Sequence, residues 1–156
     1  MSAQQRAPIS RYGLRANAHA TEVVARVEQA LRAASPKTDL EVTATPTRGY
    51  HGNSLTTLTS TVVGAAAGKA LLRHFADARL LALLWSRLTE QVDDRCQVRL
   101  RLDKQAAYGG RLEPGLRGDD VLLTLQLTSY PAHRDRAITA LDTFLRQQPW
   151  AGPPPL

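Results

Sequence analysis

A glycine-rich stretch that opens a predicted helix has the residue types of a phosphate-binding loop. It runs from Gly64 to Ala70 with the sequence GAAAGKA and follows a predicted strand. A nucleotide-hydrolysing loop needs four residues between its glycines and a Ser or Thr after its Lys to hold magnesium. This stretch has three residues there, and Ala70 follows Lys69. The mismatch argues against nucleotide hydrolysis, and we interpret the small residues as positions that let a helix pack closely.

Side chains that ligate metals or act as nucleophiles are scattered along the chain. The four histidines are His19, His51, His74 and His133. No two of them are three or four residues apart, and Cys96 is the single cysteine, so neither a zinc site nor an internal disulfide is expected. The adjacent carboxylates Asp119 and Asp120 are explained by loop solvation. We therefore predict that the chain is not an enzyme, with no catalytic residue, no metal and no cofactor.

Arginine supplies most of the positive charge. The 156-residue chain has 20 Lys and Arg against 14 Asp and Glu, a net charge of +6. Arg6, Arg11 and Arg15 precede the first acid, so the N-terminus could be a nucleic-acid-binding arm. Tyr50 or Tyr108 could stack on bases. The candidate nucleic-acid contacts are Arg11, Arg15, Arg48, Arg99 and Arg101.

The clearest structural signal lies between Cys96 and Ser129, where apolar residues fall on alternate positions in two runs. A period of two is typical of strands with one buried and one solvated face. The predicted core residues are Val98, Leu100, Leu102, Leu123, Leu125 and Leu127. Arg99, Arg101 and a set of Thr and Gln side chains occupy the other face, which predicts a two-stranded antiparallel ribbon with an open side.

The rest of the chain repeats this plan. Another ribbon is predicted from strands at residues 40–44 and 54–63. Pro46 either ends the first of these strands or marks it as an edge strand. Residues 9–14 could form a further short strand. Helical periodicity predicts a helix at residues 21–34, with Thr21 as its N-cap. It also predicts helical structure at residues 64–92, as one kinked helix or as two helices that break at Asp77. A final helix ends before Pro149. The fold class is α+β: an antiparallel sheet of about four strands in two ribbons, with about three helices on one face, as a ferredoxin-like two-layer sandwich. Residues 1–156 form one domain, with an N-terminal tail at 1–8 and a Pro-rich C-terminal tail at 149–156.

The connection at residues 104–120 is predicted to be irregular and much longer than a hairpin turn. Its apolar residues are too few to form a core of their own. We therefore expect an interaction loop formed by Tyr108, Arg111, Leu112, Leu116 and Arg117. This loop, the two tails and the open sheet face favour a non-catalytic structural or assembly subunit, for example a phage virion neck, tail or connector component. Its partners would be protein subunits in a homo-oligomer or hetero-assembly.

The alternative is a basic nucleic-acid-binding module that uses the open sheet face and the N-terminal arginines. No apolar run is long enough to span a membrane, and no signal peptide is recognisable. We expect a cytoplasmic protein, or a virion protein if the source is a phage.

Overall fold

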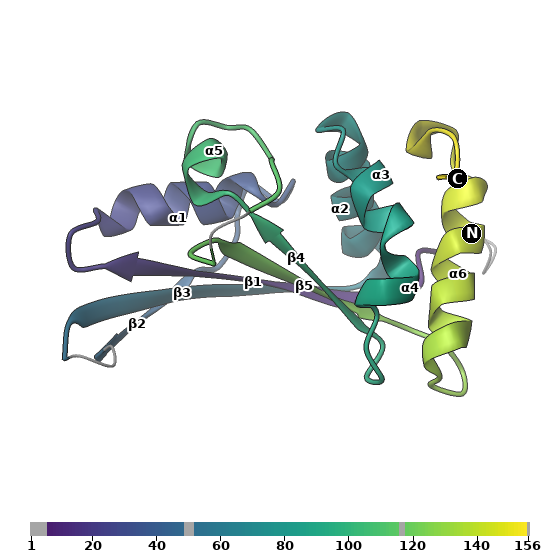
Figure 1. The fold of residues 1–156 in the computed structure, drawn as a ribbon, viewed down its shortest axis with the longest axis horizontal. Coiled ribbons are helices and arrows are strands. Elements are labelled where there is room, and N and C mark those ends of the chain that lie inside the picture. Colours follow the sequence, from purple (N-terminus) through teal and green to yellow (C-terminus); the bar gives the residue numbers. More distant parts are fainter. Residues whose placement is uncertain (1–5, 49–51, 116–117, 156) are drawn as a thin grey trace. The chain divides into compact units, whose positions relative to one another are not determined.

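Alternating buried and exposed side chains build a five-stranded antiparallel sheet. The structure, a computed structural model, describes residues 6–48, 52–115 and 118–155. The strands are β1 (Ile9–His19), β2 (Thr43–Arg48), β3 (Ser54–Val63), β4 (Gln97–Leu102) and β5 (Val121–Leu127). Their order across the sheet is β2-β3-β1-β5-β4 (Figure 1). The α+β class is confirmed, although the described residues hold five strands and six α-helices where about four and three were expected.

The strand that exceeds the prediction is the central one, β1. It extends to His19 rather than ending near Leu14, because Ala16 and Ala18 continue its buried face. Both side chains are small, so they carry a weak hydrophobic signal. The buried positions also change phase between Ile9 and Tyr12, which hides the alternation.

The two predicted ribbons are present. β2 pairs antiparallel with β3, with Thr43 opposite Thr59 and Pro46 opposite Thr56. β2 lies at the sheet edge, where a strand tolerates proline, so Pro46 marks an edge and does not end the strand. β4 lies beside β5, and all six predicted core residues of this ribbon are buried: Val98, Leu100, Leu102, Leu123, Leu125 and Leu127.

The chain divides into two compact units, and the single domain predicted for residues 1–156 stays a prediction. Unit 2 comprises Gly13–Thr61 and Leu100–Leu123. Its helices α1 (Val24–Ala33) and α5 (Lys104–Tyr108) pack together on one side of its strands, and no described helix of unit 2 covers the other side (Figure 1). The expected cap is wrong, since Val23 rather than Thr21 precedes α1 and gives no side-chain hydrogen bond.

The segment 104–120 is not wholly irregular, because α5 forms at its start. Asp103 caps this helix by accepting a hydrogen bond from the Ala106 amide at 2.8 Å. Leu102 then bridges to Pro114, and Leu112 is buried. The segment therefore departs from the irregular connection that was expected, and its apolar residue Leu112 is buried within this chain.

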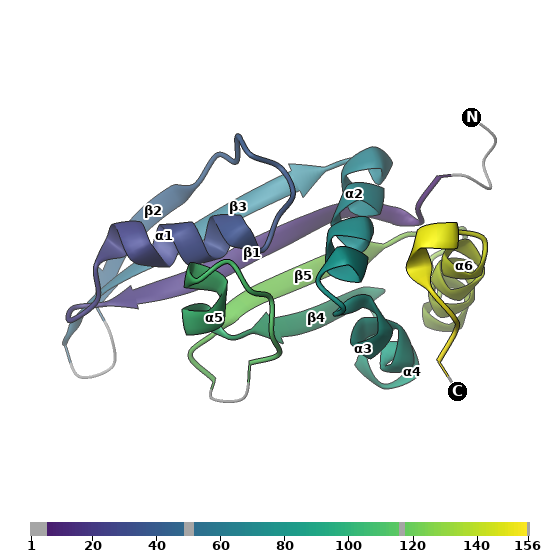
Figure 2. The ribbon, with the colours of Figure 1, turned by 90° about the horizontal axis from the view of Figure 1, so that it is seen from above.

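Unit 1 comprises Met1–Tyr12, Val62–Arg99 and Thr124–Leu156. Its helices are α2 (Ala65–Asp77), α3 (Leu81–Ser86), α4 (Leu88–Gln91) and α6 (Arg134–Arg146), followed by the 3-10 helix η2 (Pro149–Ala151) (Figure 2). The break expected at Asp77 is present, and Arg79 there has a positive φ of 61°. A Cβ on Gly68 would lie 2.7 Å from the Cβ of Ile9, so Gly68 permits close packing of α2 against β1. This confirms the packing interpretation of the Gly64–Ala70 stretch. The Pro-rich C-terminal tail begins with η2, and the ring of Trp150 lies edge-on to that of Phe144.

Candidate nucleic-acid interface

All five predicted nucleic-acid contacts lie on strands. The described strands contain five arginines and not one Asp or Glu. The exposed arginines are Arg11 and Arg15 on β1, Arg48 on β2, and Arg99 and Arg101 on β4. Arg11 and Arg15 therefore belong to the central strand and not to an N-terminal arm, and their contact with nucleic acid stays a prediction.

Arg15 and Arg101 share the open face of unit 2. Arg15 stands between the buried residues Leu14 and Ala16, and Arg101 between Leu100 and Leu102, so both arginines point away from the buried side. Their strands flank β5, so the two backbones are about 10 Å apart, twice the usual strand spacing. Neither has an acidic partner among the described residues. Both guanidinium groups are thus available to an anionic ligand.

Neutral polar side chains extend this face across β1, β2 and β3. Thr57 donates a hydrogen bond to the side-chain oxygen of Asn17 at 3.0 Å. Thr45 lies opposite Thr57, and Thr43 opposite Thr59. The one Phe, Tyr or Trp in the described strands, Tyr12, is buried. The open face therefore offers mainly cations and hydroxyl groups, and the imidazole of His19 at the end of β1 is paired with Asp119.

Two of the predicted arginines lie in different surroundings. Arg48 is opposite Ser54, four positions along the ribbon from the pair formed by Ala44 and the buried Leu58. Positions an even number apart share one face of a strand, so Arg48 is on the buried side, opposite to Arg15. Arg99, in unit 1, has a guanidinium nitrogen 3.9 Å from a carboxylate oxygen of Asp93. This exposed pair contributes little to stability. The structure thus brings together Arg15 and Arg101 and separates Arg48 from them.

A buried lysine organises one end of unit 2. The side chain of Lys104 is 7% exposed. Its ammonium donates to the carbonyl oxygen of Asn17 at 2.8 Å, to Glu22 at 3.0 Å and to Asp119 at 3.0 Å. An ammonium has three donors, so this group is fully satisfied.

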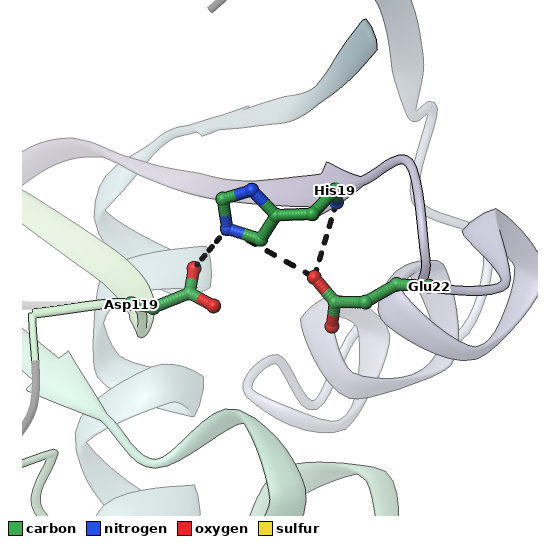
Figure 3. Close-up of side chains that lie close together, drawn as sticks. All are labelled: His19, Glu22 and Asp119. Atoms are coloured by element: carbon green, nitrogen blue, oxygen red, sulfur yellow. Dashed lines mark hydrogen bonds and ion pairs between the residues drawn. The ribbon is translucent and has the colours of Figure 1, made fainter. Parts of the chain in front are cut away.

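His19 joins the same acidic pair. Its Nε2 atom is 3.2 Å from Asp119 and 4.0 Å from Glu22 (Figure 3). Burial is the largest influence on the pKa of Asp119 and raises it, but hydrogen bonds and charge from Lys104 and His19 outweigh it and hold that pKa below its ordinary value.

One ligand atom each from His19, Glu22 and Asp119 lies within 4.8 Å of the others, a spacing that a metal ion could bridge. The ammonium of Lys104 already bonds both carboxylates, and its positive charge disfavours a cation in the same place. We therefore interpret the cluster as a structural network. Sequence spacing could not reveal it, because Asn17 and Glu22 are 87 and 82 residues from Lys104.

The predicted interaction loop is divided between several environments. Leu112 is buried, while Arg111 is exposed and pairs with Glu113 at 3.1 Å. Tyr108 is partly exposed at the end of α5. Leu116 and Arg117 lie outside the described residues, as do Tyr50 and His51. The role of this loop in contacts with a partner stays a prediction.

A cleft of about 220 Å³ in unit 2 is lined by side chains from α1 and α5 and from the residues that precede α1. Arg26 and Tyr108 stand at this cleft, and the guanidinium carbon of Arg26 is 5.8 Å from the centre of the Tyr108 ring. Sequence reasoning offered Tyr108 for base stacking but did not find Arg26, because the two residues are adjacent only through tertiary packing.

Comparison with known proteins shows the family of the chain. A family model described as RNA binding matches residues 12–127. The chain belongs to this RNA-binding family. It is 26% identical over 135 residues to the RNA-binding protein PAB1135 of Pyrococcus abyssi, a match that covers 81% of this chain and 87% of that protein.

Solved structures share the fold. The structure of Mth689, a DUF54 protein from Methanothermobacter thermautotrophicus, matches with a TM-score of 0.73 and 28% identity, over 87% of this chain and 97% of that one. Protein AF2318 from Archaeoglobus fulgidus matches with a TM-score of 0.74 and 24% identity, over 84% of this chain and 95% of that one.

These matches overturn the expected phage virion component. The family and its relative PAB1135 are described by RNA binding, and the matched proteins come from archaea. They favour the alternative, a nucleic-acid-binding module, over a structural assembly subunit. No helix among the described residues is long and apolar enough to cross a membrane.

Proposed function

We propose that the chain binds RNA through the exposed arginines of its sheet and does not catalyse a reaction on it. The observation that supports this most directly is the charge pattern of the strands, which carry five exposed arginines and no carboxylate. RNA presents a dense row of phosphates, so strands that carry arginines and no carboxylate attract it, and each arginine that contacts a phosphate displaces counterions. Arg15 and Arg101, which share the open face of unit 2, are the pair best placed to do so.

The chemistry of the open face in unit 2 favours recognition of the RNA backbone. Arg15 and Arg101 can contact phosphates, and the Thr and Asn side chains beside them can bond phosphate or ribose 2′-hydroxyl groups. The absence of an exposed Phe, Tyr or Trp from the described strands disfavours base stacking on this face. Binding at the sheet should therefore depend weakly on RNA sequence.

Two single substitutions test the proposal. Fluorescence anisotropy with short labelled RNA duplexes of several sequences would give the dissociation constants of Arg15→Ala, Arg101→Ala and the wild type. Both variants should bind each RNA several-fold more weakly, by a similar factor for every sequence. The matched control is Arg73→Ala, because Arg73 is an exposed arginine on α2 without an acidic partner among the described residues. Equal losses in all three variants, or no loss in any, would contradict binding at the sheet.

A further inference from the structure

The cleft between α1 and α5 combines apolar side chains with an exposed tyrosine ring, and the described residues of the open sheet face hold no exposed Phe, Tyr or Trp. Val23, Val27 and Ala30 of the α1 region line it, and Gln105 and Tyr108 line it from α5. Val23 is 55% exposed and Tyr108 is 38% exposed, so two large apolar side chains remain in contact with water here. A planar ligand that covers them would release this hydration and gain free energy.

Tyr108 and Arg26 form a prepared stacking platform in this cleft. The 5.8 Å separation between the guanidinium carbon and the ring centre is within the range of cation–π attraction. The side-chain amide of Gln29 donates to the carbonyl oxygen of Tyr108 at 3.2 Å, which fixes the end of α5. Arg26 has no carboxylate partner among the described residues, so its charge is available to a ligand. A tyrosine whose backbone is anchored and whose ring lies beside an available cation needs little reorganisation to accept a ligand.

The charge around the cleft permits an anionic ligand. Glu22 is the one acidic residue in the lining, and its carboxylate accepts a hydrogen bond from Lys104 at 3.0 Å. The pair is neutral overall, so the net charge of the lining comes from Arg26. The side chains of Thr21 and Gln105 line the same cleft and offer donors and acceptors.

We propose that this cleft binds an unpaired nucleobase, stacked on Tyr108 and Arg26, with its phosphate near the Arg26 guanidinium. The inference rests on the proposed function, since it assigns a second contact to the same RNA. Within unit 2 the cleft is on the helix side, and Arg15 and Arg101 are on the opposite side of the strands. Base stacking and backbone binding therefore depend on different side chains and can be measured separately.

The test compares a short blunt-ended RNA duplex with one of its strands alone, in which a single base is 2-aminopurine. The fluorescence of 2-aminopurine should fall when the wild type binds the single strand, because the base stacks on Tyr108. Stacking contributes roughly 1–3 kcal/mol per base, so Tyr108→Ala should weaken single-strand binding by about 5- to 150-fold and abolish the fluorescence change. Its affinity for the duplex should remain that of the wild type. Tyr108→Phe retains the ring and should behave as the wild type, and Arg26→Gln should lose part of the single-strand affinity.

The matched control is Tyr130→Ala, which removes a tyrosine that is 98% exposed in unit 1. It should bind both RNAs as the wild type does. A Tyr108→Ala variant that binds the single strand normally, or that loses duplex and single-strand affinity equally, would overturn the nucleobase site. If the duplex still depends on Arg15 and Arg101 in that case, the proposed function stands and only the cleft assignment fails. A wild type that binds neither RNA would overturn both.

Discussion

Replacing Lys104 by Met should destabilise unit 2 more than any other single change of a charged side chain in it. Met keeps the length of the lysine stem but removes the ammonium and its hydrogen bonds to Asn17, Glu22 and Asp119, at 2.8, 3.0 and 3.0 Å. The two carboxylates would then face each other without the ammonium that bonds both of them, and only the imidazole of His19 would remain beside them.

The magnitude follows from how deeply each member is buried. Removing one partner of a buried ion pair costs about 3–5 kcal/mol, because the other partner keeps its desolvation cost. Lys104 is 7% exposed, but the side chains of Glu22 and Asp119 are 25% and 48% exposed and can regain water. We therefore expect a loss of about 2–3 kcal/mol in the free energy of unfolding, below the full buried-pair range.

Urea unfolding followed by far-UV circular dichroism at pH 7 would measure this loss. The matched control is Lys37→Met in the same unit, since Lys37 pairs with Asp39 at 3.2 Å and both side chains are exposed. Exposed ion pairs contribute little, so the control should unfold at nearly the wild-type urea concentration. A Lys104→Met variant that unfolds together with Lys37→Met would refute the reasoning.

The remaining predictions concern pH and packing. The pKa of Asp119 is lower in the folded state than in the unfolded chain. The ionised carboxylate therefore stabilises the fold fully above the pKa of the unfolded chain, and this stabilisation is lost as the pH falls through the pKa of the folded state. Urea unfolding should show that the loss of folding free energy caused by Asp119→Asn becomes smaller below about pH 4. Gly68→Ala gains about 1 kcal/mol of helix propensity but places a Cβ 2.7 Å from that of Ile9, so overpacking of about 1–3 kcal/mol should dominate and lower the thermal midpoint, and a raised midpoint would contradict the packing geometry. Leu125→Ala should lower the free energy of unfolding by about 2–5 kcal/mol because Leu125 is fully buried, whereas Leu122→Ala, on the open face, should cost much less; equal losses would contradict the register of β5.

Strands could be predicted from the sequence where large apolar side chains mark every buried position. β4 and β5 were placed because Val and Leu mark their buried positions without interruption. The full length of β1 was missed because Ala16 and Ala18 mark its buried face only weakly. α5 is five residues long, too short for a helical period to be recognised.

The candidate sites differ in the same way. The strand arginines could be predicted, because their alternation with apolar residues is local. The Lys104 network and the pairing of Arg26 with Tyr108 could not, because each depends on tertiary contacts between residues far apart in the sequence. The expected assembly role depended on the long connection at residues 104–120. In the structure Leu112 of this connection is buried within its own chain.

The salt dependence of RNA binding tests most directly whether the sheet arginines bind the RNA backbone. The measurement is the slope of log K against log salt concentration for a short RNA duplex, with the wild type, an Arg15→Ala and Arg101→Ala double variant, and Arg73→Ala. Each phosphate contact that is removed should reduce the slope by about one, so the double variant should lose about two and Arg73→Ala should keep the wild-type slope. A double variant with the wild-type slope, or a wild type whose affinity for RNA does not fall with salt, would contradict binding of the RNA backbone by these strands.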